Sequence, residues 1–128
     1  MATKMHLSFF IFATIISIAW EPASSVTIHT VGDTLGWNLP SYPSFYTDWA
    51  EKRTFAVGDV LVFQYHTALN TVCHVSKTDY DNCTTKNSIA TYFMGNSYVT
   101  LDKPGDYYFL SSVGKHCEAG QKLWIHVA

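Results

Sequence analysis

Short runs of β-branched and aromatic residues recur along the chain, and turn-forming residues separate them. Within the runs, apolar and polar positions tend to alternate with the two-residue period of a strand, and no segment sustains a helical period. We predict strands at Val26–Val31, Val60–Tyr65, Val72–Lys77, Ser88–Met94, Ser97–Leu101, Tyr107–Leu110 and Lys122–Val127. Because these strands are short and regularly separated by turns, the pattern predicts an all-β fold in which two sheets pack as a sandwich.

Two short segments are the best helix candidates. Ser44–Glu51 begins with a residue type that favours the N-cap position, and Asp79–Asn82 lies in a turn-rich region after a predicted strand. We therefore expect one or two short helices beside the sheets.

An aromatic segment, residues 36–49, stands apart from the strand pattern. Its rings must either cover one end of the sandwich or form a contact surface. Core packing explains Trp37 and Trp49 at least as well as binding does. We assign the candidate contact surface to Tyr42, Phe45 and Tyr46, because flat rings stack on sugars or apolar groups with little loss of entropy.

The N-terminus has the features of a secretory signal peptide. Lys4 and His6 precede an uncharged apolar block, Leu7–Trp20, and small residues follow it up to Ser25. The block is shorter than the roughly 20 residues that span a bilayer, so we predict a cleaved signal peptide at 1–25 and no transmembrane segment afterwards. The mature chain, residues 26–128, has the size of one domain and is predicted to be secreted.

Composition excludes some classes of partner. The chain is 16% aromatic and 14% charged, with a formal net charge of −2, which indicates a filled core rather than disorder. It has no basic cluster that could release counterions from a phosphate backbone, so nucleic acid is not a predicted partner. The C-terminal residues do not form the signal for a lipid anchor.

The three cysteines, Cys73, Cys83 and Cys117, all follow the predicted signal peptide. In an oxidising compartment two should pair, and the residues alone permit three pairings. We favour Cys83–Cys117, because Cys83 follows a turn-rich segment whereas Cys73 lies within a predicted strand. Such a bridge would stabilise the fold by about 3 to 4 kcal/mol. Cys73 is then interpreted as a buried thiol, with a Cys73-linked dimer as the alternative.

The sequence Asn82-Cys83-Thr84 fits the N-x-S/T pattern of N-glycosylation. In a secreted protein Asn82 is therefore a candidate glycan acceptor. The neighbouring cysteine can hinder this modification if it forms a disulfide.

Ordered motifs cover almost all of the chain after the signal peptide. They include Val31-Gly32-Asp33, Phe55-x-Val57-Gly58-Asp59, Tyr80-x-x-Cys83, Gly105-Asp106-x-Tyr108-Phe109 and Gly114-x-His116-Cys117-x-x-Gly120-Gln121. In order and spacing these motifs resemble the phytocyanins, which are extracellular plant proteins with a cupredoxin fold. The resemblance implies a Greek-key β-sandwich of two sheets with one disulfide, equivalent to Cys83–Cys117. It also implies a location in the apoplast, with peripheral association with the plasma membrane as a variant.

Copper-binding phytocyanins hold a type 1 copper ion with two histidines, a cysteine thiolate and an axial Met or Gln. On this chain the resemblance places the second histidine at His116 and a stellacyanin-like axial residue at Gln121. The first histidine position holds Asn70, and the thiolate position holds Ser111. A blue site depends on a copper–thiolate bond in a plane of two imidazoles and one sulfur, so we expect no metal here. The chain is most similar to the copper-free early nodulin-like branch.

Other side chains are weaker candidates for metal ligands or catalysts. Cys73, His66 and His74 do not share a predicted point of convergence, which a metal requires. His29 is interpreted as a strand-surface residue. A hydrolase site would have to combine His116 and Asp106 with Ser111 or Ser112. The sequence shows no nucleophile elbow and no oriented base around these residues, so no enzyme activity is predicted.

The sequence therefore predicts a secreted, copper-free phytocyanin-like domain that binds a cell-wall glycan or an extracellular protein. The alternative is a blue copper electron-transfer protein that uses an irregular ligand set and one copper ion.

Overall fold

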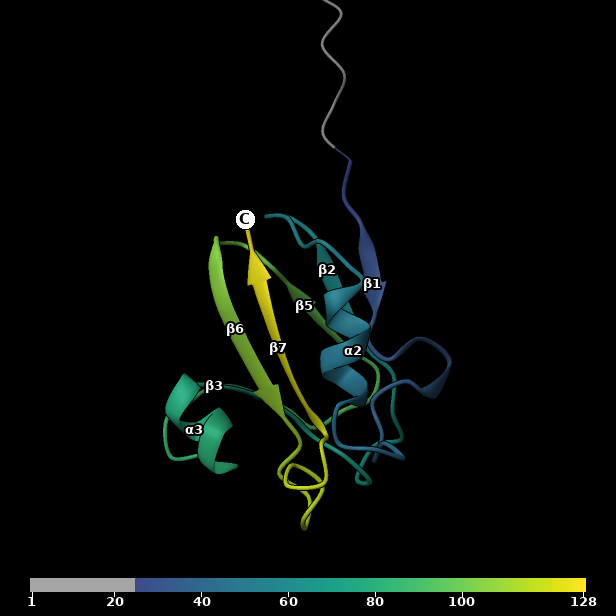
Figure 1. Cartoon of the computed structure of the whole chain (residues 1–128), viewed down its shortest axis with the longest axis vertical. Coiled ribbons are helices and arrows are strands. Elements are labelled where there is room, and N and C mark those ends of the chain that lie inside the picture. The colour runs from purple at the N-terminus through teal and green to yellow at the C-terminus, as the bar shows by residue number, and fades with distance from the viewer. Residues whose placement is uncertain (1–24) are drawn as a thin grey trace, which may run out of the picture.

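The computed structural model describes residues 25–128, in which two β-sheets pack against each other (Figure 1). Apart from Ser25, the predicted signal peptide lies outside the described residues. The smaller sheet has the order β1-β2-β5, with β1 and β2 parallel and β2 and β5 antiparallel. Its strands are β1 (Ile28–Thr30), β2 (Val60–Phe63) and β5 (Ser97–Thr100).

The larger sheet has the order β4-β3-β6-β7 and is antiparallel throughout. Its strands are β3 (Val72–Val75), β4 (Ser88–Tyr92), β6 (Gly105–Leu110) and β7 (Lys122–Val127). The two-sheet sandwich predicted from the strand pattern is thus confirmed. Side chains alternate between the core and the outside, as β7 illustrates: Leu123 and Ile125 are buried, whereas Trp124 is exposed.

Two helices and one 3₁₀ turn complete the fold, namely α2 (Phe45–Glu51), α3 (Lys77–Asn82) and η1 (Asp33–Leu35). The third predicted strand ends at Val75 instead of Lys77, because the side chain of Ser76 caps α3 by accepting a hydrogen bond from the amide of Asp79 at 3.2 Å. Helix α2 lies in the connection between β1 and β2 and contacts β7.

Tyr46 corrects one prediction, because its side chain is fully buried and belongs to the core, not to a contact surface. Its hydroxyl donates to the carbonyl of Gly36 at 2.6 Å and accepts from the amide of Asn38 at 2.9 Å. Burial raises the pKa of Tyr46 to about 12. Tyr46 therefore fixes the loop in front of α2 from the inside.

The disulfide joins Cys83 and Cys117, as predicted. It ties the end of α3 to the loop between β6 and β7, where His116 immediately precedes Cys117. Cys73 is free and only 2% exposed, and it packs with Val75, Leu110 and Cys117. The thiol is consequently not presented at the surface, which argues against a Cys73-linked dimer.

Removing the bridge should destabilise the fold strongly. In the Cys83→Ser/Cys117→Ser variant the free energy of unfolding should fall by about 4 kcal/mol, because the bridged residues are 34 positions apart. Cys73→Ala, which breaks no bridge, should cost only about 1 kcal/mol. Urea denaturation without reductant measures both, and similar losses in the two variants would contradict this assignment.

Candidate functional site

The four positions that the resemblance to phytocyanins assigned to copper ligands meet at one end of the sandwich. Asn70 directly precedes β3, Ser111 directly follows β6, and His116 and Gln121 lie in the loop that leads into β7. Strands β3 and β6 are antiparallel neighbours, with Cys73 opposite Leu110, so the start of one meets the end of the other. Figure 1 shows the β6–β7 loop at the end of the sandwich opposite the C-terminus.

At the centre of this cluster is the imidazole of His116. Its Nδ1 lies 3.1 Å from Oδ1 of Asn70 and 3.0 Å from Oε1 of Gln121. The orientation of the Asn70 amide is set from its other side, because Nδ2 donates to the carbonyl of Trp37 and to Oδ1 of Asn38, each at 3.2 Å. Since both oxygens can only accept, Nδ1 must carry a proton, and in the neutral imidazole Nε2 then has the lone pair.

Gln121 is fully buried, and only half of its amide is satisfied. Its oxygen faces the N–H of His116, whereas its Nε2 has no hydrogen-bond partner among the described residues. Turning the amide would bring its N–H groups against the protonated Nδ1, so the observed orientation is the better one. An unpartnered buried amide nitrogen costs about 1 to 3 kcal/mol, which makes this cluster less stable than its packing suggests.

Ser111 occupies the thiolate position and is 1% exposed. Its Oγ accepts a long hydrogen bond of 3.5 Å from the amide of Thr71. The cluster therefore offers one imidazole whose Nδ1 is protonated, two amide oxygens and a neutral alcohol. A type 1 copper ion takes two neutral imidazoles and a thiolate, so this donor set does not fit it.

Comparison with known proteins identifies the family of the chain. Residues 37–121 match the family model described as "Plastocyanin-like domain". The chain is 37% identical to early nodulin-like protein 14 of Arabidopsis thaliana over 98% of this chain and 68% of that protein. It is 39% identical to stellacyanin of Toxicodendron vernicifluum over 79% of this chain and 96% of that protein.

The chain belongs to the phytocyanin family. Among solved structures, cucumber stellacyanin with Cu²⁺ superposes with a TM-score of 0.74 at 37% identity, covering 83% of this chain and 97% of that one. The cupredoxin-like sandwich implied by the motifs is thus confirmed. At two of the positions that the motif resemblance assigns to copper ligands, this phytocyanin carries an amide, Asn70, and an alcohol, Ser111.

The other candidate ligands do not converge on His116. The ring of His74 stacks on Tyr107 and Phe109, with centroids 5.4 and 5.0 Å away, and burial lowers its pKa. His66 is exposed in the loop after β2. Among residues 25–128, the one close group of three ligand-type side chains is Cys83, Cys117 and Glu118, but its two sulfurs are bonded to each other.

The side chains of the candidate hydrolase group also have hydrogen-bond partners of their own. Ser112 Oγ lies 2.8 Å from Oγ1 of Thr71, and the carboxylate of Asp106 accepts from Trp124 and pairs with His126. The structure does not bring either serine together with His116 and Asp106 as a catalytic group.

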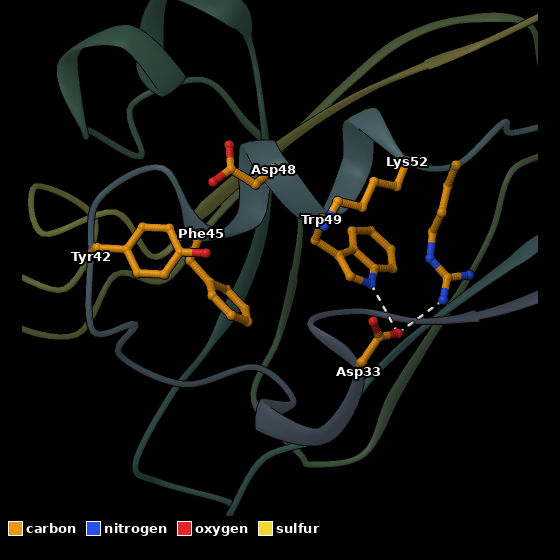
Figure 2. A pocket seen from close by; sticks show the side chains of 7 residues that line it. Asp33, Tyr42, Phe45, Asp48, Trp49 and Lys52 are labelled. Carbon is orange, nitrogen blue, oxygen red and sulfur yellow. Dashed lines mark hydrogen bonds and ion pairs between the residues drawn. The ribbon is translucent and has the colours of Figure 1, made fainter.

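A second candidate site is a pocket of about 420 Å³ beside α2 (Figure 2). It is lined by Asp33, Tyr42, Phe45, Asp48, Trp49, Lys52 and Arg53. Two of the predicted contact residues are part of it: Tyr42 is 45% exposed, Phe45 is half-buried, and their rings meet edge to face at 5.6 Å. The charged side chains that line this pocket were not predicted from the sequence. Phe45, Asp48 and Lys52 are spaced so that they lie on one face of a helix, and this spacing could have indicated part of the lining.

A chain of hydrogen bonds holds the charged end of the pocket. Asp33 Oδ1 accepts from Nε1 of Trp49 at 3.1 Å and from Nη2 of Arg53 at 2.9 Å. The guanidinium of Arg53 lies over the Trp49 ring, 4.8 Å from its centroid, and its Nη1 meets Nδ1 of His29 at 3.2 Å. The pocket wall is therefore pre-ordered without a ligand.

The same series of hydrogen bonds continues into the core at His29, and the position of this residue corrects a second prediction. It was interpreted as a strand-surface residue, but it is 3% exposed, and its Nε2 lies 2.9 Å from Oδ2 of Asp59. Because Nδ1 accepts from Arg53, Nε2 carries the proton that goes to Asp59. This hydrogen bond, together with those from the amides of Ala56 and Thr27, lowers the pKa of Asp59.

NMR of the imidazoles tests the tautomer of His116. We expect the nitrogen chemical shifts to show a protonated Nδ1 and an unprotonated Nε2 at neutral pH, because both amide oxygens face Nδ1. Asn70→Ala leaves one acceptor, and the resonance of the Nδ1 proton should shift upfield as the bond weakens. A free Nδ1 lone pair in the unmodified protein would contradict the assignment.

The hydrogen bond between His29 and Asp59 should make the free energy of unfolding depend on pH. Asp59→Asn should cost about 1 to 3 kcal/mol near pH 6, because the amide cannot accept from all three donors. The pKa of Asp59 is below its unfolded value of 3.8, so its contribution is present above pH 3.8 and is lost as the pH falls through the folded pKa. Urea denaturation between pH 2 and pH 7 should therefore show the two proteins converging at low pH. Asp102→Asn, at an exposed position, serves as the control.

Proposed function

We propose that this phytocyanin does not use copper and works as a binding domain at the cell surface or in the cell wall. The observation that carries the proposal is the position of the His116 Nδ1 between two amide oxygens, 3.1 and 3.0 Å away, which calls for a proton on that nitrogen. These hydrogen bonds already join the segment before β3 to the loop before β7.

Binding of Cu²⁺ would have to reverse this arrangement. The proton on Nδ1 must leave, the amide of Asn70 must give up its contacts with Trp37 and Asn38, and the Ser111 hydroxyl must ionise far below its ordinary pKa. The remaining ligands would be one imidazole and a weak axial amide. Free amino acids offer Cu²⁺ a better donor set, so the ion should remain with them.

Several features support an extracellular location. The family comprises extracellular and cell-surface plant proteins, the chain carries a disulfide, and residues 1–25 read as a signal peptide. Asn82, the candidate glycan acceptor, is exposed at the end of α3. In the part of the chain that the structure describes, no helix has the length and apolarity to cross a membrane.

A blue copper electron-transfer protein is the second candidate. It is favoured by His116 and Gln121, which occupy ligand positions, and by the Cu²⁺ in the structure of cucumber stellacyanin. An irregular site would need ligands from elsewhere, and the buried or stacked Cys73 and His74 are not directed at His116.

A copper titration separates the two candidates. With one equivalent of Cu²⁺ in the presence of excess glycine, the purified protein should show no intense visible charge-transfer band, because position 111 holds serine and the free thiol of Cys73 is buried. A strong band at stoichiometric copper would contradict the proposal and support the second candidate.

A double variant shows whether only the ligands differ. Asn70→His with Ser111→Cys should give a blue protein, because it restores an imidazole and a thiolate opposite His116. The matched control, Asn70→His with Ser112→Cys, carries the same residue types but places the sulfur one position away, and it should stay colourless. A blue control would mean that the position of the thiolate is not decisive.

A further inference from the structure

We propose that the pocket beside α2 binds a neutral hexose unit of an oligosaccharide. The proposal rests on the binding function proposed above and names the ligand class for it. Figure 2 shows the rings of Tyr42 and Phe45 at one end of the pocket and the group of Trp49 and Asp33 at the other. A volume of about 420 Å³ is at the small end of ligand pockets and suits one or two sugar rings.

The aromatic end supplies a surface for the apolar face of a sugar. Tyr42 is 45% exposed although it lies against Phe45, so one face of its ring is open to the pocket. Tyr42 does not belong to the core, which Tyr46 and Trp49 close from α2, whereas Phe45 packs against that core and supports the Tyr42 ring from below. An exposed ring held in place by a second ring is a rigid stacking platform that loses little entropy on binding.

The charged lining matches the hydroxyl groups of a sugar. Asp48 accepts only a long 3.3 Å bond from Ser44, and Lys52 forms no ion pair within residues 25–128. Asp33 uses Oδ1 for Trp49 and Arg53, which leaves Oδ2 free toward the pocket. Carboxylates only accept and ammonium groups only donate, whereas each sugar hydroxyl does both and can satisfy either kind of group.

The balance of charge favours a neutral ligand. The carboxylates of Asp33 and Asp48 are matched by the cations of Lys52 and Arg53. A uronic acid would bring its carboxylate near the two aspartates, and a basic peptide would bring its cations near Lys52 and Arg53. A neutral sugar avoids both repulsions, and it gains ring stacking that a simple polyol would not.

The pocket is also ordered in advance. Arg53 is fixed by Trp49, Asp33 and the buried pair of His29 and Asp59, so its side chain cannot swing into the space. Asp33 is held in the same way, because its Oδ1 accepts from both Trp49 and Arg53. A wall fixed before binding reduces the entropy that a ligand loses there.

NMR with the indole of Trp49 as the reporter tests the proposal. We would add cellohexaose, mannohexaose, β-1,3-glucohexaose, hexagalacturonate and hexalysine to the purified protein in separate titrations. At least one neutral hexasaccharide should shift the Trp49 indole N–H to saturation with a Kd of about 1 mM or tighter. The indoles of Trp37 and Trp124, which do not line the pocket, should stay in place. Hexagalacturonate and hexalysine should bind at least fivefold more weakly.

Two pairs of variants localise the binding. Tyr42→Ala should weaken it at least tenfold, whereas Tyr98→Ala, at a tyrosine that is 65% exposed on β5, should change it less than twofold. Asp48→Asn, which leaves every ring intact, should weaken binding at least threefold, and Asp102→Asn should not. If Tyr42→Ala fails to fold, the comparison of Asp48→Asn with Asp102→Asn still shows whether the ligand binds in this pocket.

Each other outcome overturns the assignment. These outcomes are no shift with any neutral hexasaccharide, tighter binding of the charged probes, or equal effects of Tyr42→Ala and Tyr98→Ala. The copper titration is independent of them. A protein that is colourless with copper and silent toward sugars would refute the hexose site and leave the proposed binding function standing, whereas a blue protein would refute that function.

Discussion

One hydrogen-bonded proton on the imidazole of His116 determines what this end of the sandwich can do. With Nδ1 protonated and held by Asn70 and Gln121, the nitrogen that faces the cluster has no lone pair for a metal. The same bonds link the start of β3 to the loop before β7, and the Cys83–Cys117 bridge anchors that loop to α3. A structural role that a metal ion could fill is thus filled by neutral groups, at the cost of one unpartnered amide nitrogen.

A second network runs from the core to the surface beside α2. It starts at the buried carboxylate of Asp59, passes through His29 and Arg53, and ends at Asp33 on the wall of a pocket. Each link along this path is a hydrogen bond of 2.9 to 3.2 Å, so the path holds the pocket wall in one arrangement. A pocket whose wall is ordered in this way suits the binding function proposed above.

Much of this could be predicted from the sequence, because the relevant signals are local. The period of two identified the strands, and the bounds of β7 agree residue for residue. The motif spacing placed Asn70, Ser111, His116 and Gln121 together, and the structure brings them to one end of the sandwich.

The errors concern side chains whose environment is set by distant residues. Tyr46 was assigned to the surface because its neighbours are aromatic, but the packing of α2 against the loop at Gly36 buries it. His29 follows an exposed residue at a strand edge, and only the parallel pairing of β1 with β2 brings Asp59 to it from 30 positions away. The charged lining of the pocket depends on the same long-range contacts, so the pattern of α2 alone could not reveal that Asp33 and Arg53 complete it.

The most direct test of the central claim is the metal content of the protein purified from its native tissue. Mass spectrometry of the intact folded protein, combined with elemental analysis, measures the copper per chain. We predict less than about one copper ion per ten chains, because the donor set around His116 cannot retain Cu²⁺ through purification. One tightly held copper ion per chain would contradict the account.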